Sequence, residues 1–163
     1  MPLTYQQLQN YLKIYPDEID IVQAFEALGS QSKKPHSVEI SGSAWIIRPS
    51  DHTVLLLKNQ LSSPWPLPQG ELHSLYNTPE TIKQIAKQST QLRSDLTLVN
   101  NQIFHLSIQY KPTANDTKHH YLFDICMLFY IKEPFSTIDD GQQSYSWHNT
   151  ADLLYNIRHN KKL

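Results

Sequence analysis

Apolar residues recur at every second position in three segments of this chain, residues 38–47, 104–110 and 121–131. This period is typical of β-strands that bury one face and leave the other to polar residues. In the third segment the apolar face would consist of Tyr121, Phe123, Ile125, Met127, Phe129 and Ile131. A face of this length needs a second layer to cover it, so the sequence predicts a sheet packed against helices.

Helical spacing marks three further segments. In the first, Tyr5, Leu8 and Leu12 share one stripe after Thr4, which would cap the helix. The second predicted helix covers residues 16–29, because Pro16 suits a first turn and Gly29 offers a stop. The third covers residues 79–91 and places Ile82, Ile85, Ala86 and Ser89 on one face.

Short strands at 53–57 and 143–147 and a last helix after Thr150 complete the predicted order. Helices and strands in this order predict an α+β fold with a mixed or mostly antiparallel sheet. The polar segment 30–37 is typical of a linker. It would separate an N-terminal helical extension, residues 1–36, from the main domain, residues 37–163, within one compact unit.

The charges of the chain nearly cancel, with 14 Lys and Arg against 15 Asp and Glu. A non-specific nucleic-acid binder should be more basic. The single Cys126 excludes an internal disulfide and a multi-cysteine zinc site. No secretory signal is visible, and the longest apolar run, 121–131, is far below the roughly 20 residues that a membrane helix needs. We therefore expect a cytoplasmic protein without nucleic-acid or membrane partners.

Landmarks spread over residues 37–154 resemble the Nudix fold. They are the strand SAWII, the loop SSPWPLPQG with Trp65, Pro68 and Gly70, the strand of His120 and Asp124, and Trp147 with Leu153 and Leu154. The resemblance implies a Nudix-like α/β/α sandwich with a mixed sheet. It also implies a metal-binding helix, the Nudix box, directly after the loop. The N-terminal helices resemble the extension of some bacterial members.

The box itself departs from the family pattern. That pattern is Gly, five residues, Glu, seven residues, then Arg-Glu-apolar-x-Glu-Glu-x-Gly-apolar, and its glutamates hold Mg²⁺ against the diphosphate. Counted from Gly70, Tyr76 stands at the first Glu position, and the pattern positions within 84–92 hold no acid. A register shifted by one residue places Lys83, Gln84, Lys87 and Gln88 at the Arg and Glu positions. Neither register contains a carboxylate.

This loss changes what the helix can bind. Gln offers a neutral carbonyl oxygen, whereas a hard dication usually takes charged oxygens, and Lys87 would place a cation where the metal belongs. Metal-dependent catalysis through the box is therefore not expected. Lys83 and Lys87, with Gln84 and Gln88 beside them, could instead bind a phosphate directly, or they could form an ordinary solvated helix face.

Three acids outside the box are candidates for catalysis or metal binding: Glu71, Glu80 and Asp124. Glu80 is also favoured by the helix dipole alone, because it falls in a first turn. Asp124 lies in an apolar strand, so its carboxylate must be paired or solvated. Pairing with an Arg or a backbone amide and lining of a ligand cleft both remain open.

Two aromatic residues and one thiol have alternative roles. Trp65 and Tyr76 could stack on a base or sugar, and Trp65 could equally pack over the sheet edge. Cys126 has no base partner in the sequence and is expected to be a packed thiol.

Four histidines, His73, His105, His119 and His120, could meet at one end of the sheet. Their spacing matches no zinc signature, so separate surface histidines are the simpler interpretation.

Three functions remain open at this point. The first is a non-hydrolytic or weakly active pseudoenzyme that binds a nucleoside-diphosphate-like or phosphorylated ligand without a cofactor. The second is an active diphosphate hydrolase that uses acids outside the box and Mg²⁺. The third is a protein-interaction module that uses the N-terminal helices or the Pro-rich loop, with a homodimer or another protein as its partner.

Overall fold

The computed structural model describes residues 5–29, 37–58, 66–73, 75, 77–111, 120–133 and 145–150. These residues form a six-stranded mixed sheet with helices packed against it. The elements are α1 Tyr5–Ile14, η1 Pro16–Glu18, α2 Ile19–Gly29, β1 Val38–Arg48, β2 Thr53–Leu57, β3 Gln69–Glu71, α3 Thr78–Thr90, β4 Leu96–Lys111, β5 His120–Ile131 and β6 Tyr145–His148. The α+β class and the mixed sheet predicted from the sequence are confirmed.

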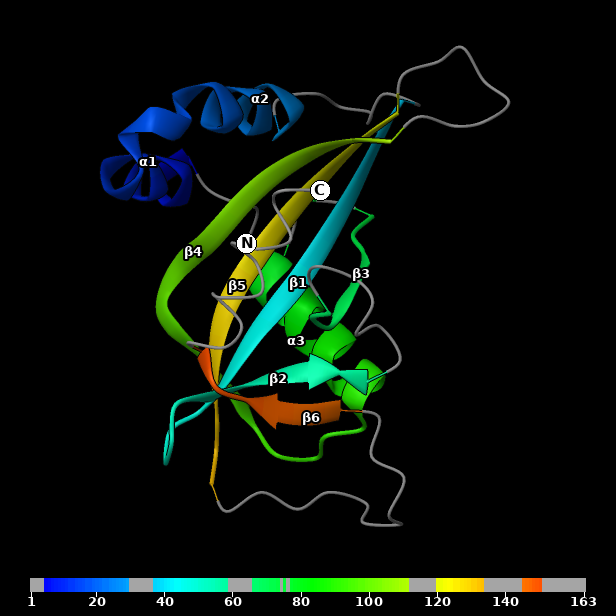
Figure 1. The fold of residues 1–163 in the computed structure, drawn as a ribbon. Helices are drawn as coiled ribbons and strands as arrows, with labels where there is room; N and C mark the ends of the chain where they lie inside the picture. The colour runs from blue at the N-terminus through cyan, green and yellow to red at the C-terminus, as the bar shows by residue number, and fades with distance from the viewer. Residues whose placement is uncertain are drawn as a thin grey trace.

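The centre of the sheet is the pair β1 and β5. Five strands follow one another in the order β4-β5-β1-β2-β6, and β3 pairs separately with β1. Strands β1 and β5 are parallel over ten residues, from Val38 opposite Tyr121 to Ile47 opposite Tyr130. The other pairings are antiparallel. Figure 1 shows β4, β5 and β1 side by side as long strands, with α3 behind them.

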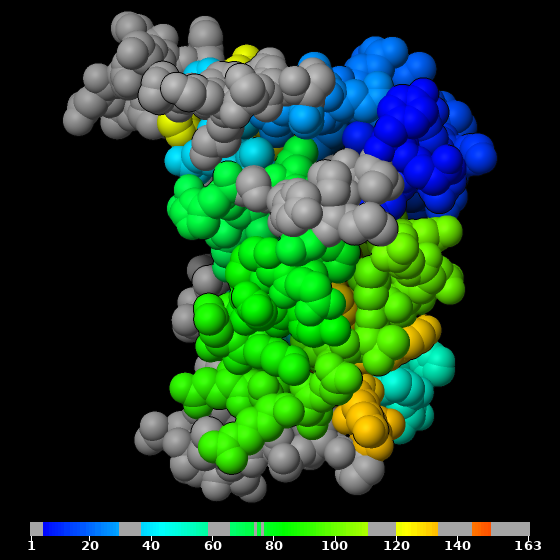
Figure 2. All heavy atoms as spheres, turned by 180° about the vertical axis from the view of Figure 1, so that it is seen from behind, coloured from blue at the N-terminus to red at the C-terminus, as the bar shows by residue number. Residues whose placement is uncertain are grey.

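Helix α3 covers one face of this sheet. Its residues Ile82 and Ala86 are fully buried, and they join a core with Phe129, Ile125 and Met127 of β5. Gly42 in β1 permits this contact, because a Cβ there would lie 2.5 Å from Cγ1 of Ile82. Seen from behind in Figure 2, the side chains of α3 spread over the middle of this face. Because Gly42 has no side chain, α3 can pack close to the sheet.

The N-terminal helices share the same core. Leu8 and Tyr11 of α1 and Val22 and Phe25 of α2 are buried in the cluster that contains the sheet residues. The Phe25 ring meets the Phe123 ring of β5 edge-on, with ring centroids 5.0 Å apart. The extension predicted from the sequence thus packs directly on the sheet. Of the linker predicted at 30–37, residues 30–36 lie outside the described residues.

One hydroxyl joins α1 to the outermost long strand, β4. The Tyr11 hydroxyl donates to Glu18 Oε1 over 2.9 Å and accepts a hydrogen bond from the Leu106 backbone N–H over 3.1 Å. Burial raises the pKa of Tyr11, so this hydroxyl stays protonated and can donate. It satisfies a backbone amide of an edge strand that would otherwise need water or another chain.

Several local predictions were wrong in instructive ways. Tyr5, placed on the buried stripe of α1, is 69% exposed, whereas Tyr11 is buried. Strand β4 begins eight residues before the predicted 104. The prediction missed this first part because the alternation is interrupted where Asn100 and Asn101 adopt positive φ. This irregularity shifts the register of β4 against β5.

Two further expectations concern the loop and the chain end. Gln69 and Gly70 were predicted as the end of the loop, but with Glu71 they form β3, because they find a partner in β1. The last helix predicted after Thr150 lies outside the described residues. No helix within the described ranges is long and apolar enough to cross a membrane.

Replacing Gly42 with Ala should destabilise the protein. The new Cβ would press on Ile82 and also approach Leu72 Cδ1 at 3.2 Å, and such overpacking costs about 1–3 kcal/mol. Urea unfolding would measure the loss. Gly29→Ala is the matched control, since its nearest contact is Leu75 Cδ1 at 3.8 Å. Equal stability of the two variants would contradict the close approach of α3.

Replacing Tyr11 with Phe should lower the free energy of unfolding by about 1–3 kcal/mol, because the Leu106 amide loses its buried acceptor. Thermal and urea unfolding would report the change, with Tyr5→Phe at an exposed position as the control. Unchanged stability of Tyr11→Phe would show that water replaces the hydroxyl without cost.

Candidate functional site

The helix that would carry the box is α3, and its lysines are engaged only weakly. Lys83 Nζ lies 3.7 Å from Glu80 Oε1 in the first turn of the same helix. Lys87 Nζ lies 3.9 Å from Asp95 Oδ1, which comes just before β4. Both distances exceed a hydrogen bond, and pairs of this kind contribute little to stability. Both ammonium groups therefore retain the capacity to bind an anion.

The glutamines of this helix, Gln84 and Gln88, are both exposed. Ile82 and Ala86 are buried against the sheet, and both belong to the apolar stripe of the helix that the sequence predicted. Trp65 and Tyr76, predicted as stacking residues, lie outside the described residues. The helix thus presents two cations and two amides next to a buried apolar stripe.

The residues of α3 do not fit a magnesium site. Glu80 supplies its one carboxylate, in the first turn, where it pairs with Lys83. Magnesium is normally held by carboxylates together with substrate phosphates and waters. Among the described residues no group of three His, Cys, Asp or Glu side chains could hold a metal ion.

The candidate acids are divided between the two faces of the sheet: Glu71 stands opposite Ser41 in the pairing of β3 with β1, on the face of Asp124, whereas Glu80 lies on the other face. Glu71 is exposed on β3, with Oε1 4.0 Å from Nδ1 of His73. Glu80 belongs to α3, which packs on the Gly42 face of β1. Asp124 lies on the other face, because it bonds to Ser41 and Ser43, which flank Gly42. The sheet therefore separates Asp124 from Glu80 and from both lysines.

Asp124 is the centre of a buried polar cluster that spans three strands. Its Oδ1 accepts from Ser41 Oγ over 2.6 Å and from Gln69 Nε2 over 3.1 Å, and its Oδ2 accepts from Ser43 Oγ over 2.8 Å. Gln69 Nε2 also donates to Ser41 Oγ over 3.1 Å. No ion pair joins Asp124 to a cation among the described residues. Pairing was expected with an Arg or a backbone amide, but the observed partners are two hydroxyls and a side-chain amide.

The cluster reaches solvent through one of its members. Asp124 is 8% exposed and both serines are buried, whereas Gln69 on β3 is exposed. Burial of a carboxylate is costly unless hydrogen bonds compensate it, and here three neutral donors do so. The Asp124 carboxylate thus lies close to the surface behind the exposed Gln69 side chain.

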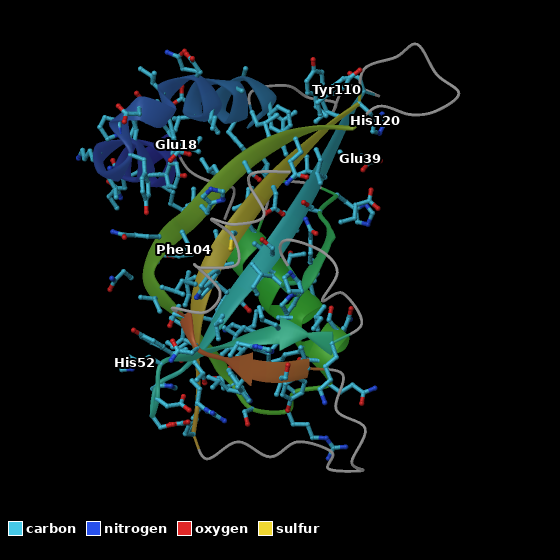
Figure 3. The ribbon with its side chains drawn as sticks, in the orientation of Figure 1. Glu18, Glu39, His52, Phe104, Tyr110 and His120 are labelled. Carbon is cyan, nitrogen blue, oxygen red and sulfur yellow. The ribbon has the colours of Figure 1, made fainter. Side chains whose placement is uncertain are left out.

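An apolar patch adjoins the cluster on the same face. Trp45, two residues beyond Ser43, packs against Phe104 with ring centroids 5.4 Å apart. Both belong to a second, smaller hydrophobic cluster with Leu67 and Cys126. Figure 3 labels Phe104 beside the long strands.

Ser41, Ser43 and Gln69 were missed by the sequence analysis. A signal was present, because serines at alternate positions of a strand otherwise rich in apolar residues mark a polar row on one face. What the sequence could not show is that this row faces Asp124, 83 and 81 residues away.

The histidines are spread over the surface. His120 Nε2 lies 3.0 Å from Glu39 Oε1 at one end of β1 and β5, where Figure 3 labels both residues. His73 and His105 are exposed at other places, and His119 lies outside the described residues. The interpretation as separate histidines agrees with the positions of the described three.

Cys126 is a packed thiol, as predicted. Burial, with a smaller contribution from the negative charge of Asp124, raises the pKa of Cys126 to about 12, although a hydrogen bond with Ser43 acts in the opposite direction. The thiol is therefore protonated at neutral pH, which leaves it a poor nucleophile.

Cys126 should react with a thiol reagent such as DTNB only when the chain opens. In the native protein the buried neutral thiol should be modified far more slowly than in denaturant, where the usual thiol pKa returns. The absorbance of the released thiolate would follow the reaction. Fast labelling of the native protein would contradict the burial of Cys126.

The sequence matches no protein-family model, and no curated protein matches it. Among solved structures, the chain is similar to a NUDIX-family hydrolase from Clostridium perfringens, with 15% identity and a TM-score of 0.49 over 71% of this chain and 84% of that one. The C. elegans Ap4A hydrolase is 14% identical, with a TM-score of 0.45 over 77% and 90%. The E. coli dihydroneopterin triphosphate pyrophosphohydrolase is 13% identical, with a TM-score of 0.44 over 71% and 84%. These identities and TM-scores are too low to carry a family or a function from any of these proteins to this chain.

Proposed function

We propose that this chain is a Nudix-fold protein that binds a nucleoside-diphosphate-like ligand and does not hydrolyse it through the box helix. The observation that carries the proposal is the make-up of α3. Two loosely paired lysines occupy the helix, and its one carboxylate, Glu80, lies in the first turn, 3.7 Å from Lys83 Nζ. A cation can neutralise a phosphate where a metal ion otherwise would.

The separation of the acids supports binding over hydrolysis. A hydrolase that works outside the box needs carboxylates close enough to share a metal ion or to activate a water. Glu80 and Asp124 lie on opposite sides of the sheet, and the Asp124 carboxylate already accepts three hydrogen bonds. A hydrolase centre that combines Glu80 with Asp124 therefore lacks support.

A second function, protein interaction, has its own observation. Apolar side chains are exposed along the N-terminal helices, namely Tyr5, Ile14, Tyr15 and Ile19. Scattered apolar residues are ordinary on protein surfaces, so the binding proposal takes precedence. Sedimentation of the purified protein would show whether these residues join two copies.

Calorimetry with ADP-ribose and ADP, without metal and then with Mg²⁺, tests the binding proposal. We expect binding heat without metal and no product in the same samples. Lys87→Ala should weaken binding about 10-fold or more, because a hydrogen bond to a charged group is worth about 1.5–3 kcal/mol. Lys132→Ala, an exposed lysine just after β5, is the matched control.

The other outcomes separate the alternatives. Product that appears only with Mg²⁺ and disappears in Glu71→Ala or Asp124→Ala would establish the hydrolase instead. The absence of both heat and product would contradict ligand binding and leave the interaction module.

A further inference from the structure

The hydrogen bonds of Asp124 do not use all the acceptor positions of its carboxylate. An ionised carboxylate has about four acceptor positions, two on each oxygen. Ser41 and Gln69 occupy both positions on Oδ1, and Ser43 occupies one on Oδ2. Among the residues that the structure describes, Ser43 is the one donor to Oδ2, so its second acceptor position remains open.

Gln69 is the replaceable member of the cluster. Its Nε2 contacts are the longest, at 3.1 Å, whereas the two serine hydroxyls lie at 2.6 and 2.8 Å. Its side chain is exposed and comes from the short strand β3, while both serines are buried in β1. A ligand can reach Asp124 by displacing this amide, at the cost of two long hydrogen bonds.

Displacement of Gln69 leaves one open acceptor position on each carboxylate oxygen. Two neighbouring acceptors match a planar group with two adjacent N–H donors, which binds a carboxylate through two parallel hydrogen bonds. The Watson–Crick edge of guanine, with N1–H and the 2-amino group, and a guanidinium group both have this form. A base with a single donor at this edge would leave one oxygen unpaired.

We infer that Asp124, held by Ser41 and Ser43 and covered by Gln69, is a recognition site for a planar group with two adjacent N–H donors. The choice of a nucleoside diphosphate as the ligand rests on the proposed function. The group that meets Asp124 is then the guanine base of that nucleotide. The serines keep the carboxylate in place, and the exchange of Gln69 for the ligand supplies the selectivity.

Calorimetry with GDP, IDP and ADP tests the inference, because hypoxanthine in IDP differs from guanine only by the missing 2-amino group. We expect GDP to bind about 10-fold or more tightly than IDP, since a bidentate contact discriminates by about 1–3 kcal/mol. In Asp124→Asn, one acceptor becomes a donor, so the GDP-to-IDP ratio should fall to within about 2-fold. Equal binding of GDP and IDP by the unaltered protein would overturn the inference while leaving nucleotide binding intact.

Two further variants guard against a folding artefact in Asp124→Asn. Ser43→Ala keeps the carboxylate and should retain the preference for GDP. Gln69→Ala should bind GDP at least as tightly as the unaltered protein, because the displaced amide is no longer present. Gln109→Ala is its matched control, an exposed residue of β4 on the same face, opposite Leu122. Loss of GDP binding in Gln69→Ala alone would show that Gln69 is a fixed contact and overturn the displacement.

A small probe makes the test independent of the phosphate site. Methylguanidinium carries the same pair of donors, and its titration should shift the side-chain amide NMR signal of Gln69, identified by its absence in Gln69→Ala. If no nucleotide binds but methylguanidinium shifts this signal, the proposed function fails and the inference stands. If neither nucleotides nor methylguanidinium have an effect, the inference is overturned as well.

Discussion

The parallel pairing of β1 with β5 is the constraint on which the rest of the structure depends. Its ten-residue register places Ser41 beside Asp124 and Gly42 beside Ile125. Because strand side chains alternate between faces, this one register assigns every residue of both strands to a side. A slip by one residue would turn Asp124 toward α3 and Ile125 toward the serines, which no partner could compensate.

The two faces so defined have different chemistry. On one, Gly42 lets Ile82 approach the backbone, so that α3 lies close to the sheet and carries Lys83 and Lys87 outward. On the other, hydroxyls and an amide hold a carboxylate next to an aromatic pair. The lysines of α3 and the Asp124 cluster therefore lie on opposite faces and cannot form one compact metal centre.

The N-terminal helices belong to the same physical arrangement. Strand β4 is an edge, and its exposed amides would invite pairing with another chain. Tyr11 satisfies the Leu106 amide, and Phe25 packs on Phe123. The extension thus completes the core and protects the edge, which explains why its buried stripe runs through Tyr11 and not through Tyr5.

The sequence by itself determined the order of the helices and long strands, the alternation of β1 and β5 and the scarcity of carboxylates in α3, because these depend on residue type and local period. It did not determine the length of β4, since the positive φ of Asn100 and Asn101 hides the strand from a test of alternation. Nor could it pair Ser41, Ser43 and Gln69 with Asp124, because these contacts join residues 55 to 83 positions apart. Only the tertiary structure decided that Asp124 and the lysines lie on opposite faces, since the face of each side chain follows from strand register, and register is set by long-range packing.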